Sequence, residues 1–152
     1  QFSNHTIKRI YEALVWGSLK PQNGKINEKI SRSVKNRQLM SVRKEKGKIA
    51  ITNYKTLKVF QNLNLPKISL IECQLETGRT HQIRVHLTSI HHPIIGDKLY
   101  GGKCSQLKME RQALHAHKLE LKHPITGSNL SFCAPLAPDM VVFLQSHGYD
   151  LQ

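Results

Sequence analysis

The most chemically informative segment of the sequence, residues 75–102, reads LETGRTHQIRVHLTSIHHPIIGDKLYGG. Thr77 and Gly78 predict a turn that places Arg79 beside the N-terminus of a helix, where unpaired backbone N–H groups and the helix dipole favour an anion. A guanidinium in that position can bind a carboxylate or a phosphate through two parallel hydrogen bonds. Arg79 is therefore a candidate anion-binding residue.

The charge balance of the whole chain also favours an anionic partner. Lys and Arg number 23 against 10 Asp and Glu, which gives a formal net charge of +13. Basic side chains release condensed counterions when they bind phosphates, and this gives largely sequence-independent affinity for nucleic acid. A basic surface without a partner is the competing interpretation. No apolar run approaches the ~20 residues needed to cross a bilayer, and no basic amphipathic helix dominates the chain, so we expect no membrane association.

Two further basic side chains, His81 and Arg84, lie on or beside the first turns of the helix that would follow Arg79. They are candidates for extending the positive surface toward phosphates. In the alternative interpretation, Arg79 forms a structural ion pair and the histidines are ordinary surface or core residues. The residue types by themselves leave both interpretations open.

The cysteines and the first residue bear on location. Cys73, Cys104 and Cys133 are an odd number, widely spaced, with no CxxC pair. This pattern predicts free thiols in a reducing compartment and no metal site. The chain begins at Gln1 and shows no signal peptide, so we expect a cytoplasmic protein and a start inside a longer one.

Hydrophobic periodicity predicts the elements that position these residues. Strands are expected at 10–16, 25–30, 47–60, 68–75, 115–122 and 129–134. Helices are expected at 80–90, with Thr80 as N-cap, and at 139–147. The polar, strongly basic residues 31–46 predict an exposed loop or ribbon, and residues 57–66 a connection. This order indicates a mixed α+β domain with a largely antiparallel sheet and few helices.

The segment at 75–102 closely resembles the third signature of the RluA-like pseudouridine synthases. Other pieces agree in order and spacing: KRIYEALVWG at 8–17, GKIAITNY at 47–54, RQALHAHKLELKHPITG at 111–127 and CAPLAPDM at 133–140. The resemblance covers nearly the whole chain and implies an enzyme that isomerises uridines in RNA without a metal or organic cofactor. It is strongest to a branch that modifies a stem-loop of large-subunit ribosomal RNA, which is therefore the implied partner.

The resemblance also implies roles for particular positions. Tyr11 matches the active-site tyrosine, which stacks on the target base and is a candidate for removing the C5 proton; its residue type alone would indicate a core aromatic. Arg79 matches the arginine that pairs with a catalytic aspartate and would keep that carboxylate ionised. Leu114 is expected beside the substrate pocket. His81, Gln82 and Arg84 complete the motif without an assigned chemical step. We group His81 and Arg84 with Leu114 as candidate substrate-binding residues.

One departure from the family pattern concerns the nucleophile. The family's nucleophilic aspartate lies in an HRLD-type motif upstream of the tyrosine strand, and nothing similar occurs in the 152 residues. Asp97 lies in a loop expected to be structural, Asp139 is expected to cap a helix, and Asp150 lies near the chain end. We therefore expect residues 1–152 to be the C-terminal part of a catalytic domain and to be inactive alone. The alternative is a non-catalytic basic module that binds RNA or assists ribosome assembly; the oligomeric state is left open.

Overall fold

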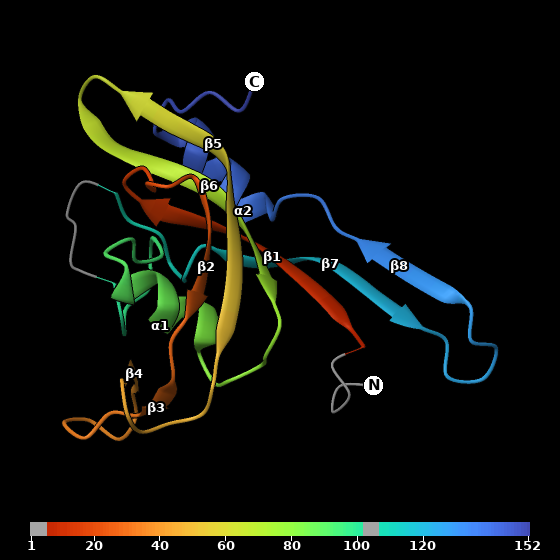
Figure 1. Ribbon diagram of the computed structural model, residues 1–152. Coiled ribbons are helices and arrows are strands. Elements are labelled where there is room, and N and C mark those ends of the chain that lie inside the picture. Colours follow the sequence, from red (N-terminus) through yellow and green to blue (C-terminus); the bar gives the residue numbers. More distant parts are fainter. Residues whose placement is uncertain (1–5, 102–106) are drawn as a thin grey trace.

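The computed structural model describes residues 6–101 and 107–152 of the chain. Within them, six strands form one antiparallel sheet in the order β2-β5-β6-β1-β7-β8 (Figure 1). The strands are β1 (Lys8–Trp16), β2 (Asn23–Asn27), β5 (Ile51–Asn62), β6 (Leu65–Leu75), β7 (Leu114–Lys122) and β8 (Asn129–Cys133). The helices are α1 (Gln82–Ser89) and α2 (Pro138–Ser146). The expected α+β class, with a largely antiparallel sheet and few helices, is confirmed.

Strand β1 lies in the middle of the sheet and carries Tyr11. It pairs with β6 along one edge and with β7 along the other. Ala13, Leu14 and Val15 are consecutive and fully buried, which is possible because both faces of this strand are covered. The backbone at Tyr11 is therefore fixed from two sides.

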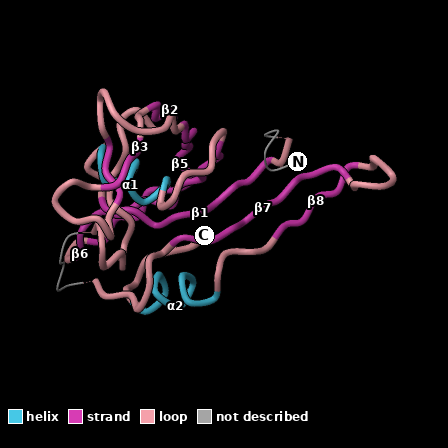
Figure 2. The backbone as a smooth tube through the Cα atoms, turned by 90° about the horizontal axis from the view of Figure 1, so that it is seen from below, coloured by secondary structure: helices cyan, strands magenta, loops and turns pink. Residues whose placement is uncertain are grey.

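The two helices cover opposite faces of the sheet (Figure 2). Helix α1 contributes Ile83 and Leu87 to the core, and α2 contributes Met140 and Leu144. The 3.6-residue spacing of these positions gives each short helix one apolar side to bury. The loop between β6 and α1, which holds Arg79, thus lies on the α1 side of the sheet.

A separate two-stranded sheet is formed by β3 (Ile30–Arg32) and β4 (Met40–Val42). It confirms the expected ribbon, and we call residues 31–46 the basic ribbon. The strand expected at 25–30 is instead divided, because β2 pairs with β5 whereas Ile30 turns away to form a bridge with Lys48.

Two further expectations are wrong. Residues 57–66 are not a connection but the end of β5 and the start of β6, joined by a tight turn at Leu63 and Asn64. Register shifts in the β5–β6 pairing disturb the alternation that would have identified the long strands. Thr80 is not the N-cap of α1; His81 occupies that position with φ of 55° and no capping bond from its side chain.

Candidate active site and nucleic-acid interface

Tyr11 borders a pocket of about 350 Å³ on the face of β1 and β7. Its partners across the sheet are Cys73 on β6 and Ala116 on β7. The β1–β7 register shifts between Ile10 and Tyr11, and the extra residue is His117 on β7, because Ile10 pairs with Lys118 and Tyr11 with Ala116. The Tyr11 ring is half-buried and lines the pocket, so it can contact a planar ligand there.

Leu114, the first residue of β7, lies next to the strand position that carries Tyr11. It pairs with Ala13, whose side chain points to the same face as that of Tyr11 because the two are two residues apart. Leu114 is half-buried and packs against the core. It does not line the Tyr11 pocket in this structure.

Arg79 lies in the loop between β6 and α1 and is held by two hydrogen bonds. Its Nε donates to the carbonyl of Ile49 at 2.9 Å, and its backbone N–H donates to Oε1 of Gln82 at 3.0 Å. The residue borders a second hollow of about 440 Å³, whose other wall is formed by residues of the basic ribbon and the following turn, among them Arg32 and Lys48. A phosphate or carboxylate entering this hollow would meet several cations.

Arg9 connects the two hollows. Its side chain lines the Tyr11 pocket, and its guanidinium lies directly over Gly78, where a Cβ atom would come within 2.8 Å of Nη1. Gly78 precedes Arg79, so the Tyr11 pocket and the Arg79 hollow are neighbours. The Nε of Arg9 is buried and has no hydrogen-bond partner among the described residues. Sequence reasoning missed Arg9, although its position two residues before Tyr11 puts both side chains on one strand face.

A buried chain of hydrogen bonds supports the Arg79 turn from below. Oε1 of Gln82 accepts from the hydroxyl of Thr77 as well as from Arg79, and Nε2 of Gln82 donates to the carbonyl of Ile51 and to Oγ1 of Thr52. Every polar atom of the Gln82 side chain is thus used, as burial requires.

The same chain continues to His86, which is fully buried. Its ring nitrogens meet the hydroxyl of Thr52 at 2.8 Å and the carbonyl of Glu28 at 3.0 Å. Because a carbonyl only accepts, Nε2 must carry the proton and Nδ1 must accept from Thr52. Burial lowers the pKa of His86, against the smaller opposing effect of the Glu28 carbonyl. His86 is therefore a neutral structural residue.

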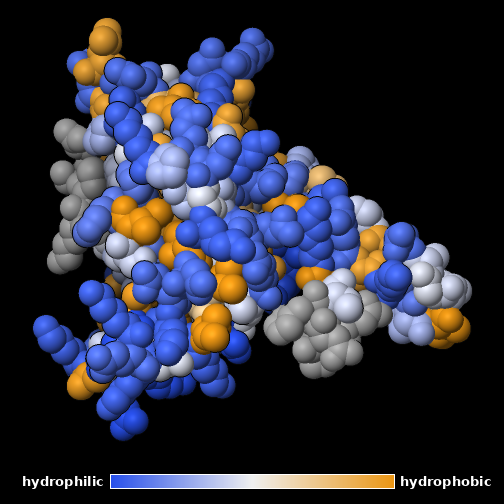
Figure 3. Space-filling view, viewed as in Figure 1, coloured by the Kyte–Doolittle hydropathy of each residue, from blue (hydrophilic) through white to orange (hydrophobic). Residues whose placement is uncertain are grey.

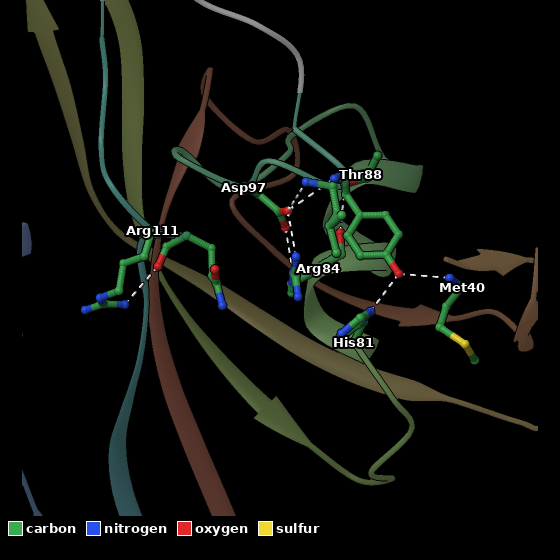
Figure 4. Close-up of polar contacts among 9 residues, drawn as sticks. Met40, His81, Arg84, Thr88, Asp97 and Arg111 are labelled. Carbon is green, nitrogen blue, oxygen red and sulfur yellow. Dashed lines mark hydrogen bonds and ion pairs between the residues drawn. The ribbon is translucent and has the colours of Figure 1, made fainter. Parts of the chain in front are cut away.

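Arg84, the second arginine of the motif, is engaged by Asp97 (Figure 4). Its Nε and Nη2 donate to the two carboxylate oxygens at 2.7 and 2.8 Å, and the Arg84 side chain is only 12% exposed. Burial by itself would raise the pKa of Asp97, but hydrogen bonds from Arg84 and from the backbone N–H of Tyr100 outweigh it and hold the pKa below its ordinary value. Asp97 thus has the structural role that the sequence indicates.

His81 and Arg84 both contact Tyr100. The Tyr100 hydroxyl lies 2.8 Å from Nδ1 of His81, and the Arg84 guanidinium lies 5.0 Å from the centre of the Tyr100 ring. Burial, followed by the charge of Arg84, lowers the pKa of His81. The structure therefore brings His81 and Arg84 together, and a direct contact of either with RNA stays a prediction.

The basic ribbon presents most of its charge to solvent. Its cations are Arg32, Lys35, Arg37, Arg43, Lys44 and Lys46. None of the ion pairs found in residues 6–101 and 107–152 involves any of them. Hydrophilic side chains dominate this end of the molecule in the space-filling view (Figure 3). Unpaired exposed cations are available for phosphates.

The described residues contain neither a candidate metal site nor a candidate membrane-crossing helix. They contain no group of three His, Cys, Asp or Glu side chains that could hold a metal ion. Their helices are too short and too polar for any of them to cross a membrane. The thiol of Cys104, one of the three expected free thiols, lies outside the described residues; Cys73 and Cys133 are free.

Comparison with known proteins defines the class. Residues 1–89 match the family model described as RNA pseudouridylate synthase, and the chain belongs to that family. It is 40% identical to an uncharacterized RNA pseudouridine synthase of Chlorobaculum parvum over 95% of this chain and 48% of that protein. It is 42% identical to the ribosomal large subunit pseudouridine synthase D of Zymomonas mobilis over 92% of this chain and 45% of that protein. The chain thus spans about half the length of these relatives.

Solved structures show the same fold. The human RNA pseudouridylate synthase domain containing 1 superposes with a TM-score of 0.77 at 27% identity, over 88% of this chain and 56% of that one. The human domain containing 4 superposes with a TM-score of 0.74 at 23% identity, over 99% and 66%. The resemblance inferred from the motifs, including that to the synthase D branch, is confirmed.

Proposed function

We propose that the natural protein containing this chain converts uridine to pseudouridine in large-subunit ribosomal RNA in the cytoplasm. The observation that carries the proposal is the adjacency of the Tyr11 pocket and the Arg79 hollow, joined by Arg9 over Gly78. A base flipped out of its stack needs an aromatic platform, and its flanking phosphates need cations. The name ribosomal large subunit pseudouridine synthase D, which several relatives carry, supports the substrate class.

In the proposed reaction an aspartate attacks C1′ of the ribose and displaces the uracil at N1. The uracil then turns, its C5 attacks C1′ and displaces the aspartate, and C5 loses its proton while N1 gains one. Tyr11 stacks on the uracil and is the candidate base for that proton. Arg79 pairs with the aspartate and favours its ionised form. Leu114, His81 and Arg84 are proposed to contribute to binding of the RNA substrate. No step requires a metal or an organic cofactor.

Residues 1–152, in this proposal, form the C-terminal part of the catalytic domain and do not turn over RNA by themselves. The three aspartates of the chain all have other partners: Asp97 binds Arg84, Asp139 binds Arg111, and Asp150 accepts a hydrogen bond from the backbone of Gln152. None borders the Tyr11 pocket. These contacts support the proposal that the nucleophile comes from sequence outside these residues.

The test compares the natural protein with residues 1–152 on ribosomal RNA labelled with tritium at C5 of uridine. Isomerisation replaces the C5 hydrogen, so the natural protein should release tritium to solvent and the isolated segment should not. Release by the segment would contradict the assignment of the missing nucleophile. RNA binding without release by the natural protein would instead favour the alternative, a non-catalytic module that binds RNA or assists ribosome assembly.

A further inference from the structure

The basic ribbon is joined to the rest of the protein by a hydrogen bond that the proposed reaction does not use. The hydroxyl of Tyr100 accepts from the backbone N–H of Met40, the first residue of β4, at 2.8 Å. The same oxygen lies 2.8 Å from Nδ1 of His81 at the start of α1. A phenol can accept one hydrogen bond and donate another, so a single oxygen links the ribbon to the helix.

Tyr100 itself is held firmly in this position. The Asp97 carboxylate accepts from the backbone N–H groups of Leu99 and Tyr100, and the backbone carbonyl of Asp97 accepts from Gly101. Arg84 closes the arrangement by pairing with Asp97 (Figure 4). Its guanidinium also lies 5.0 Å from the centre of the Tyr100 ring. A side chain fixed at both its backbone and its ring can position whatever its hydroxyl binds.

The position of Met40 matters because it borders the Arg79 hollow. Met40 and Arg32 line one wall of that hollow, and Gly78, Arg79 and Thr80 line another. Met40 also pairs with Arg32 in the ladder between β3 and β4. The hydrogen bond at Met40 therefore sets where the cations of the ribbon lie relative to Arg79.

We infer that Tyr100 is a positioning residue for RNA binding, which holds the basic ribbon at the distance from Arg79 that lets both contact the phosphates of one RNA segment. The inference rests on the proposed function. Tyr100 does not touch RNA in this arrangement and acts through Met40. Tyr100 thus sets the position of the ribbon side of the Arg79 hollow, although it lies 60 positions after Met40 in the chain.

The first test measures affinity of the natural protein and of Tyr100→Phe for a uridine-containing RNA stem-loop at several KCl concentrations. Removal of the hydroxyl should raise Kd several-fold. It should also make the plot of log K against log [KCl] less steep, because each phosphate that is no longer neutralised lowers the magnitude of the slope by about 0.7–0.9. In turnover, KM should rise while kcat stays within about twofold, since binding rather than the chemical step is changed. Tyr149→Phe is the matched control: its hydroxyl donates to Pro66 at the far end of β6, so Kd and slope should not change.

A double-mutant cycle separates positioning from general destabilisation. Lys35→Gln with Arg37→Gln removes two exposed ribbon cations without touching Tyr100. In that background Tyr100→Phe should have a smaller effect on Kd, because two of the six cations that it positions are gone. Hydrogen exchange should show faster exchange at the Met40 amide and unchanged protection in β1 and β6.

Each result has a defined meaning. An unchanged Kd and slope in Tyr100→Phe, or an equal effect in both backgrounds, would overturn the inference. Loss of protection throughout the sheet would overturn it too, because Tyr100 would then be a folding residue. These outcomes differ from failure of the proposed function, in which the unchanged protein binds RNA but releases no tritium.

Discussion

The backbone N–H of Arg79 donates a hydrogen bond to the side-chain oxygen of Gln82, three residues further along the chain. The side-chain NH₂ group of Gln82 donates to two groups of β5, the carbonyl of Ile51 and the hydroxyl of Thr52. One buried side chain therefore fixes the Arg79 turn to the sheet.

Replacing Gln82 by Leu should destabilise the protein strongly. Leu has nearly the same size but leaves the Arg79 N–H and the Thr77 hydroxyl without their acceptor, and unsatisfied buried groups of this kind together cost about 2–4 kcal/mol. Urea unfolding measures the change in free energy. Gln145→Leu on the exposed side of α2 is the control and should change the free energy by less than about 0.5 kcal/mol. Equal effects of the two substitutions would show that the network contributes little.

Two arginine–aspartate pairs of the same geometry should differ in their contribution to stability. Arg84–Asp97 and Arg111–Asp139 both have an Nε to Oδ2 distance of 2.7 Å, but the carboxylates are 1% and 47% exposed. Asp97→Asn should cost about 3 kcal/mol because it leaves Arg84 poorly solvated and unpaired. Asp139→Asn should cost about 1 kcal/mol or less because water screens an exposed pair. Similar shifts in the urea midpoint for both variants would contradict this burial argument.

Stability should fall in mild acid because of His86. Its folded-state pKa lies below the ordinary value of 6.5, so the unfolded chain binds a proton more readily than the folded protein does. Neutral His86 therefore makes its full contribution to the free energy of unfolding above pH 6.5. This contribution is lost as the pH falls from 6.5 toward the folded-state pKa. Urea unfolding from pH 7.5 to 5 should show this loss, and His86→Gln should remove that part of the pH dependence.

The control for His86 is His91→Asn. His91 is exposed and has a φ of 65°, a conformation that Asn tolerates. This variant should keep the pH dependence of the unchanged protein. If His86→Gln showed the same slope of stability against pH as His91→Asn, another group would be responsible.

Tyr11→Phe should leave the fold intact and reduce turnover by the natural protein. The ring still stacks on a base, but the hydroxyl proposed to take the C5 proton is gone, and loss of a general base lowers kcat by roughly 100-fold or more. Tritium release under saturating RNA measures kcat, and RNA affinity should change little. Tyr149→Phe serves again as the control, since its hydroxyl lies at the far end of β6. Tyr11→Phe with full kcat would remove Tyr11 from proton transfer.

Local sequence patterns determined most of the elements. The hairpin of β7 and β8 and the helix begun by Pro138 were predictable because alternation, turn residues and a helix-starting proline act within a few residues. The 57–66 connection was wrong because two register shifts in the β5–β6 pairing disturb the alternation by which a strand is recognised in a sequence.

The sequence by itself determined the family, the residue types of the candidate site and the excess of positive charge. Only the tertiary structure decided which side chains meet. It gave Arg84 to Asp97 rather than to solvent, placed Arg9 between Tyr11 and Arg79, and brought Tyr100 to Met40. The physical reason is that hydrogen bonds and ion pairs between residues far apart in the chain depend on where the sheet and its helices place them, and that placement follows from burial of the whole core rather than from any local pattern.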